Sequence, residues 1–324
     1  MRRPPLGEPH AMKRLSLLSS LLLTALLGVG CASTPAPAKP YAPTDTGNAF
    51  LWEVKDGSGR GGTAYIVGSI HMGREGELTL PPAMETAFAK SDALVVEVDV
   101  GKVDPAVMQK LVMELGRFPE GQRLSQRLDP VTMTLLGRAT ERMGVPVSSF
   151  EPLRPWLVSM VLSITELQKA GYQQGHGVDR AFLDRAQAAN KPVLELETAE
   201  GQLRMLAGTP DALQDLMLRD QLRRTREAGE VLHQLISAWK AGDADGMATL
   251  LLEGAADPTY RPVYERIFFE RNVQMATGVD ALLGQPKTHF VVVGAGHVVG
   301  PEGLVALLQK KGHAVRQLPR AAAE

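Results

Sequence analysis

The chain has 324 residues, a formal net charge of −1, and hydrophobic residues at 44% of its positions. This charge balance argues against a nucleic-acid or polyanion partner, because such partners select a large excess of Lys and Arg. Aromatic residues make up only 5% of the chain, which disfavours a broad sugar-stacking surface. The length suits one large domain, or a domain with a helical insertion.

The N-terminal segment has the pattern of a targeting signal. Lys13 and Arg14 precede an apolar run, 15–30, that is too short to span a bilayer comfortably. The run ends in LLGVGC, and Cys31 is the only cysteine. The pattern resembles a bacterial lipoprotein signal, in which the chain is cut before the cysteine and Cys31 then carries lipid. A simple secretory peptide with an incidental cysteine is the alternative.

Three regions follow from this interpretation. Residues 1–30 are predicted to be the signal peptide, read from Met1 or from Met12, and 31–47 a flexible tether rich in Pro, Ala, Ser and Thr. The folded domain is predicted to cover 48–320. Since Ala rather than Asp follows the cysteine, the resemblance favours an outer-membrane anchor, with the domain facing the periplasm.

The first half of the domain begins with strand-like runs. Residues 50–55 and 63–67, joined by the turn sequence DGSGRGG, predict a hairpin. LPPAMETAFAKSD predicts a helix that opens at its prolines. ALVVEVDV at 93–100 predicts a buried strand, and alternation places Glu97 and Asp99 on one face of it.

The middle of the chain is predicted to be helical, over 104–114, 130–143, 155–170, 178–189, 211–241 and 243–251. PVLELE at 192–197 predicts one short strand within it. A last long helical stretch, 258–283, is followed by a strand, a helix and a strand at 288–293, 300–311 and 314–318. The pattern predicts an α/β or α+β fold, in which both chain ends build a central mixed sheet and the helix-rich middle forms a lobe over it.

Two short motifs carry the clearest functional signal. GSIHMG at 68–73 and GAGHVVG at 294–300 each place a histidine three residues after a glycine, directly after an apolar run. His71 and His297 would then lie at strand carboxyl ends, where open α/β sheets bind ligands. Imidazole binds divalent metals and transfers protons near neutral pH. The alternative is that each ring only closes a turn; His176, in GYQQGHGVD, is a secondary candidate.

Acidic and basic residues extend this site. A buried Glu97 is costly unless it is paired or binds a cation, and with two histidines it matches the composition of catalytic zinc or iron(II) sites. A strand-end salt bridge is the alternative. Glu197 lies in a second acidic strand, LELET. Arg271, in ERN, offers a donor fork suited to a carboxylate or an oxyanion, although an Arg on a helix usually faces solvent.

The motifs LWEV, YIVGSIH, VVEVD, GVD, LELET, ERN and VVVGAGHVVGPEGL follow one another in this order, and with them the chain resembles the TraB/GumN family from 50 to 318. That family is grouped with the Tiki proteins, which are regarded as metal-dependent proteases. It is grouped more distantly with erythromycin esterase-like enzymes and with haem-binding ChaN-like lipoproteins. The resemblance implies an active-site group of His71, Glu97 and His297. It also implies that further family positions are matched by Arg271, Asn272, Asp179 and Glu197.

The resemblance therefore implies an envelope-anchored hydrolase that uses a divalent metal, such as cobalt, manganese or zinc, to cleave peptide bonds. His71, Glu97 and His297 would all bind the metal, or some would bind it while another acts as the general base. Arg271 would orient a substrate carboxylate or stabilise an oxyanion. A metal-free variant, with one histidine as general base, stays open, as does a small-molecule substrate. The alternatives are a ChaN-like lipoprotein that binds haem or another ligand without catalysis, and an exopolysaccharide-export accessory protein.

Overall fold

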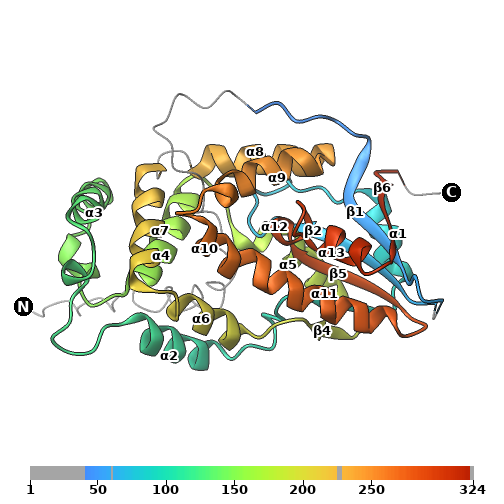
Figure 1. The fold of residues 1–324 in the computed structure, drawn as a ribbon, viewed down its shortest axis with the longest axis horizontal. Helices are drawn as coiled ribbons and strands as arrows, with labels where there is room; N and C mark the ends of the chain where they lie inside the picture. Colours follow the sequence, from blue (N-terminus) through green and yellow to red (C-terminus); the bar gives the residue numbers. More distant parts are fainter. Residues whose placement is uncertain (1–40, 60, 225–227, 322–324) are drawn as a thin grey trace, which may run out of the picture.

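The computed structural model describes residues 41–59, 61–224 and 228–321. A six-stranded mixed sheet with the order β4-β3-β5-β2-β1-β6 forms the right half of the molecule in Figure 1. The strands are β1 Asn48–Lys55, β2 Thr63–Ser69, β3 Ala93–Val96, β4 Val193–Glu195, β5 Thr288–Gly294 and β6 Ala314–Pro319. β2, β5, β3 and β4 run parallel to one another, and β1 is antiparallel to β2 and β6. The predicted mixed sheet built from both chain ends is confirmed.

The parallel part of the sheet decides where the site lies. β3 and the inner part of β5 are continuous apolar runs, buried on both faces as parallel strands usually are. In the register, Ser69 is opposite Gly294 and Val96 is opposite Val292. The carboxyl ends of β2, β5 and β3 therefore meet at one edge of the sheet, and the residues that follow them become neighbours.

Helices from the middle of the chain form a lobe beyond one end of the sheet, on the left of Figure 1. Two apolar cores hold it together, one where α2, α4 and α6 meet and one where α3, α4 and α7 meet. The helices from the middle of the chain are α2 Pro105–Gly116, α3 Pro130–Arg142, α4 Pro155–Lys169, α5 Val178–Ala188, α6 Ala199–Ala207, α7 Asp211–Arg224, α8 Ala228–Ala241 and α9 Ala244–Leu252. Of these, α5 packs on β3 and α8 on β1, so both belong to the core of the sheet. The predicted helical lobe is thus confirmed.

Most of the remaining helices pack on the sheet and its edge, whereas α10 packs against α7. α1 contacts β1, β2 and β5, and α11 contacts β2. Their bounds are α1 Pro82–Lys90, α10 Arg261–Tyr264, α11 Glu270–Leu283, α12 Ala295–Val298 and α13 Leu304–Lys310. A π-helical turn, Glu265–Phe269, joins α10 to α11, so the stretch predicted as one helix over 258–283 changes its winding just before the ERN motif.

Two other features differ from the predictions, and the continuity of one predicted helix is not tested. The strand predicted over 93–100 ends at Val96, because the Asp99 N–H donates instead to the Glu195 carboxylate. The helix predicted over 211–241 is described as α7 and α8, on either side of 225–227, which lie outside the described residues. α6 was not predicted; it begins at the cap Thr198, whose side chain accepts from the Gly201 N–H.

The signal peptide and the lipidation site at Cys31 lie outside the described residues, and both stay predictions. Residues 41–47, the end of the predicted tether, lie against the turn between α8 and α9. There Tyr41 Oη donates to Asp243 Oδ2 at 2.6 Å, and the Thr46 N–H donates to the Ala241 carbonyl at 3.0 Å. Within the described ranges, none of the helices has both the length and the apolar character needed to cross a membrane.

Candidate functional site

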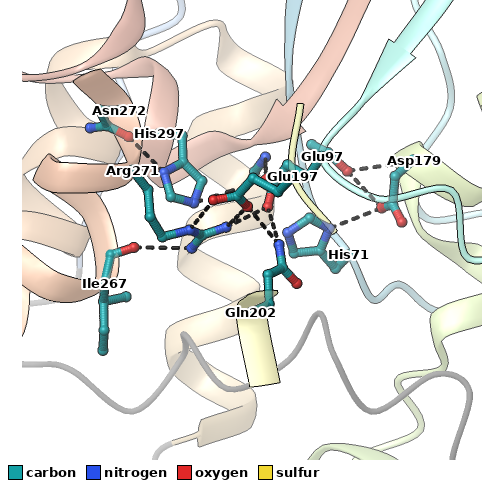
Figure 2. A network of polar contacts seen from close by, with 11 residues as sticks. His71, Glu97, Asp179, Glu197, Gln202, Ile267, Arg271, Asn272 and His297 are labelled. Atoms are coloured by element: carbon teal, nitrogen blue, oxygen red, sulfur yellow. Dashed lines mark hydrogen bonds and ion pairs between the residues drawn. The ribbon is translucent and has the colours of Figure 1, made fainter. Parts of the chain in front are cut away.

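The two motif histidines and Glu97 meet where the parallel strands end, as Figure 2 shows. His71 follows β2, Glu97 follows β3 directly, and His297 lies in the short helix α12 after β5. Glu97 is buried and the His297 side chain has no exposed surface, whereas 15% of the His71 side chain is exposed. His71 is therefore the histidine nearest to solvent, and His297 is the inner one.

Gly294 lies between the three side chains. A Cβ on Gly294 would be 2.9 Å from His71 Nε2, 3.3 Å from Glu97 Oε1 and 3.5 Å from His297 Cδ2. The backbone of Gly294, with φ −54° and ψ 141°, is one that any residue can adopt. Glycine is required here by the side chains around it, and the missing Cβ leaves a small space that all three share.

Asp179, in the first turn of α5, orients His71. Its Oδ1 lies 3.1 Å from His71 Nδ1 and accepts a hydrogen bond from Ser69 Oγ at 2.7 Å, while the Asp179 N–H donates to Ser69 Oγ at 3.1 Å. Burial alone would lower the pKa of His71, but the Asp179 carboxylate outweighs it and raises that pKa above its ordinary value. With Nδ1 turned to Asp179, Nε2 faces the space beside Gly294.

Asn272 orients His297 in a corresponding way. Asn272 Nδ2 donates to the Glu302 carbonyl at 2.8 Å, and Asn272 Oδ1 lies 2.6 Å from His297 Nδ1. The Phe268 ring packs against the imidazole with a centroid distance of 5.3 Å. Among the described residues His297 Nε2 has no hydrogen-bond partner, although it is buried and lies 3.9 Å from Glu97 Oε1.

Arg271 is the buried counter-ion of two carboxylates. Its Nε and Nη2 donate to Glu197 at 2.8 and 2.6 Å, Nη2 also donates to Glu97 Oε2 at 2.8 Å, and Nη1 donates to the Ile267 carbonyl at 3.0 Å. Gln202 Nε2 joins the same two carboxylates, at 3.2 Å from Glu97 and 2.8 Å from Glu197. Because each guanidinium nitrogen already has an acceptor and the residue is only 6% exposed, Arg271 holds the site together from within.

The charges of the cluster push the pKa values of its members apart. Burial would raise the pKa of Glu97, but His297, Arg271, His71 and the Gly294 N–H, at 2.5 Å from Oε1, outweigh it and hold that pKa at about 2. Burial and the Arg271 charge lower the pKa of His297 to about 3. Glu97 is therefore a fixed carboxylate and His297 a neutral base over the physiological range.

The donor set suits a divalent cation by its chemistry but not by its present spacing. No group of three His, Cys, Asp or Glu side chains in the described part of the chain is spaced so that it could hold a metal as it stands. The chemistry of the donors nevertheless fits, since each histidine has Nδ1 anchored by an outer acceptor and Nε2 turned inward, as in metal-binding histidines. Glu97 and Glu197 share the single guanidinium of Arg271, and the carboxylate of Asp179 faces His71, so negative charge is left uncompensated when the imidazoles are neutral. Binding would therefore require a change in the positions of these side chains.

The structure brings together seven predicted residues, namely His71, Glu97, Asp179, Glu197, Arg271, Asn272 and His297. His176 lies in the 3₁₀ turn Gln174–His176 before α5 and is not part of this network. Ser69 and Gln202 were not predicted. The motif GSIHMG contained a signal for Ser69, whereas nothing in the sequence around Gln202 distinguishes it from a surface glutamine.

The chain is similar to several known proteins. The model of the TraB/PrgY/gumN family matches residues 50–317. The uncharacterized protein YbaP of Escherichia coli is 29% identical over 265 residues, 81% of this chain and 94% of that protein. Metalloprotease TIKI1 of Danio rerio is 25% identical over 338 residues, 88% of this chain and 66% of that protein. Metalloprotease TIKI2 of Danio rerio is 26% identical over 354 residues, 92% of this chain and 67% of that protein. No solved structure matches the chain significantly.

Proposed function

Since the chain belongs to the TraB/PrgY/gumN family, we propose that it is a metal-dependent hydrolase that cleaves peptide bonds. One observation carries the proposal: His71 Nε2, Glu97 Oε1 and the His297 ring surround the bare Cα of Gly294, at a sheet edge where parallel strands end. The distant relatives named metalloprotease support the choice of reaction.

His71, Glu97 and His297 would hold the cation. A divalent cation in such a site polarises a carbonyl group and lowers the pKa of water. Asp179 keeps His71 Nε2 directed at the reaction space, and Asn272 does the same for His297. In the metal-free variant, His71, as the most exposed of the three, would instead take a proton from water at Nε2, the nitrogen that would bind the cation in the metal-dependent reaction.

Arg271 has a positioning role in this proposal. Its donors are engaged by Glu197, Glu97 and the Ile267 carbonyl, so it holds Glu97 charged and in place instead of contacting substrate. This replaces the expectation that Arg271 binds a substrate carboxylate or an oxyanion. A haem is not favoured by any contact in the site, because the His297 side chain is fully enclosed and packed on Phe268.

The test is peptide cleavage by the full chain after chelation, with cobalt, manganese or zinc restored one at a time. Cleavage products of a mixed peptide pool are identified by mass spectrometry. We expect activity that returns with metal and that is lost in His71→Ala and in His297→Ala. His233→Ala is the matched control, since His233 is exposed on α8 away from the network. Cleavage that survives chelation would support the metal-free variant, and equal cleavage by all three variants would refute the site.

We also propose that the protein is held in the cell envelope by lipid on Cys31. The LLGVGC run that ends at this cysteine supports the proposal. Peptides or peptide segments in the periplasm would then be its substrates. Metabolic labelling with a fatty acid tests this anchor. Label should enter the wild-type chain and be lost in Cys31→Ser, and a wild-type chain without label would refute the anchor.

A further inference from the structure

The orientation of His297 depends on a chain of contacts that leads out of the site. The Glu302 carbonyl can only accept a hydrogen bond, so the amide group of Asn272 that faces it must be the NH₂ group. Asn272 Oδ1 then faces His297 Nδ1 and can only accept. Nδ1 must therefore carry the proton, and Nε2, directed toward Glu97, must carry the lone pair.

The outer end of this chain is an ion pair. Arg261 donates to both carboxylate oxygens of Glu302, from Nη1 and Nη2 at 2.9 Å each. Arg261 Nε also donates to Glu265 at 2.6 Å, and the guanidinium lies 4.4 Å from the centre of the Phe269 ring. Arg261 thus ties the loop that contains Glu302 to the π-helical turn Glu265–Phe269. Bidentate geometry is the arrangement in which a partly exposed ion pair has a measurable effect.

The same residue provides both contacts. The Glu302 side chain binds Arg261, and its backbone carbonyl binds the Asn272 amide. The loop around Glu302 is a tight turn, with Gly300 at φ +81° and with the Val299 carbonyl only 2.2 Å from where a Cβ on Gly303 would lie. Because the ion pair ties this turn to the π-helical turn, its loss removes a constraint on the position of the Glu302 carbonyl.

From these contacts we infer that Arg261 and Glu302 are positioning residues that hold His297 in one tautomer, with the proton on Nδ1 and Nε2 free. The tautomer itself does not depend on the proposed function. Its consequence, a preformed metal-ligand nitrogen at Nε2, does rest on that function. Neither residue touches the space beside Gly294, so both act only through Asn272.

The test is nitrogen NMR of the metal-free full chain with ¹⁵N-labelled histidine rings. The His297 signals are assigned by their loss in His297→Gln. In the wild type we expect a protonated Nδ1 and an unprotonated Nε2. Arg261→Glu places three carboxylates together, and it should shift the His297 signals toward an average of the two tautomers. The double variant Arg261→Glu with Glu302→Arg restores the pair and should restore the wild-type signals.

Two further variants make the outcome decisive. Arg316→Glu removes an ion pair of similar length with Glu53, between β6 and β1, and should leave the His297 signals unchanged. Arg261→Gln, which adds no charge, covers the case that Arg261→Glu does not fold, and it should give a smaller shift in the same direction. A wild-type His297 with its proton on Nε2, or an unchanged tautomer in the folded Arg261 variants, would overturn the inference.

Cobalt binding supplies the second readout. We expect the affinity for Co²⁺ to fall about ten-fold in Arg261→Glu, at the low end of the effect of outer partners of metal ligands, and to recover in the double variant. If the wild type binds no Co²⁺ but shows the expected tautomer, the proposed function fails and the inference about Arg261 and Glu302 stands. If Co²⁺ binds and the tautomer does not respond to Arg261, the inference fails and the proposed function stands.

Discussion

Gly294→Ala adds a single methyl group at the centre of the candidate site. The new Cβ would lie 2.9 Å from His71 Nε2 and 3.3 Å from Glu97 Oε1, both closer than ordinary carbon contacts. The backbone at φ −54° and ψ 141° accepts alanine without strain, so the effect should come from the side chains alone. Since the atom that must yield is the end of the His71 ring, we expect a loss in unfolding free energy of about 1 kcal/mol, the low end for overpacking.

Function should suffer far more than stability. A displacement of about 1 Å at a catalytic group can reduce the rate about 100-fold, and we expect a loss of kcat/KM of that order. Urea unfolding followed by circular dichroism gives the stability, and the metal-dependent peptide cleavage described above gives the rate. Gly137→Ala in α3, where an added Cβ meets nothing within 4 Å, is the control and should be slightly more stable and fully active. A Gly294→Ala protein that cleaves like the wild type would refute the site, and a loss of stability above about 3 kcal/mol would refute the packing argument.

Three further predictions concern charges. Arg271→Gln leaves the buried Glu97 and the partly buried Glu197 without their counter-ion and should reduce the unfolding free energy by about 3–5 kcal/mol. Part of the loss should be recovered when Glu197→Gln is added, and an unchanged urea midpoint would contradict the role of Arg271 as their counter-ion. Asp179→Asn should weaken Co²⁺ binding about 10- to 100-fold in a titration, because Asp179 orients His71. Asp184→Asn, on the exposed side of the same helix, should leave the affinity for Co²⁺ unchanged. Equal affinities of Asp179→Asn and the wild type would show that Asp179 does not contribute to the site. Burial lowers the pKa of His289 in the folded state, so the unfolded chain binds more protons than the folded chain as pH falls below about 6.5, and stability is lost on acidification. The difference in urea midpoint between pH 7 and pH 5 should therefore be smaller in His289→Gln than in the wild type. An equal or larger difference would contradict the lowered pKa of His289.

The local sequence was informative wherever a short pattern decides the structure. Apolar runs before both histidine motifs predicted β2 and β5, and the expected position of His71 and His297 at strand ends followed from those runs. Helix positions in the middle of the chain followed from their caps and prolines. Where two patterns compete, the prediction failed. The run 93–100 continues as a strand by composition, but the contact between the Asp99 N–H and Glu195 ends it at Val96.

The sequence by itself determined that two histidines and a glutamate follow buried strands, because a run of apolar residues and its spacing are local properties of the chain. It could not determine which groups complete the site. Glu97 and Arg271 are 174 positions apart, and only the packing of α11 against the sheet, after the π-helical turn Glu265–Phe269, brings the guanidinium between Glu97 and Glu197. Whether an arginine faces solvent or two buried carboxylates is settled by contacts between distant segments, and those contacts exist only in the folded chain.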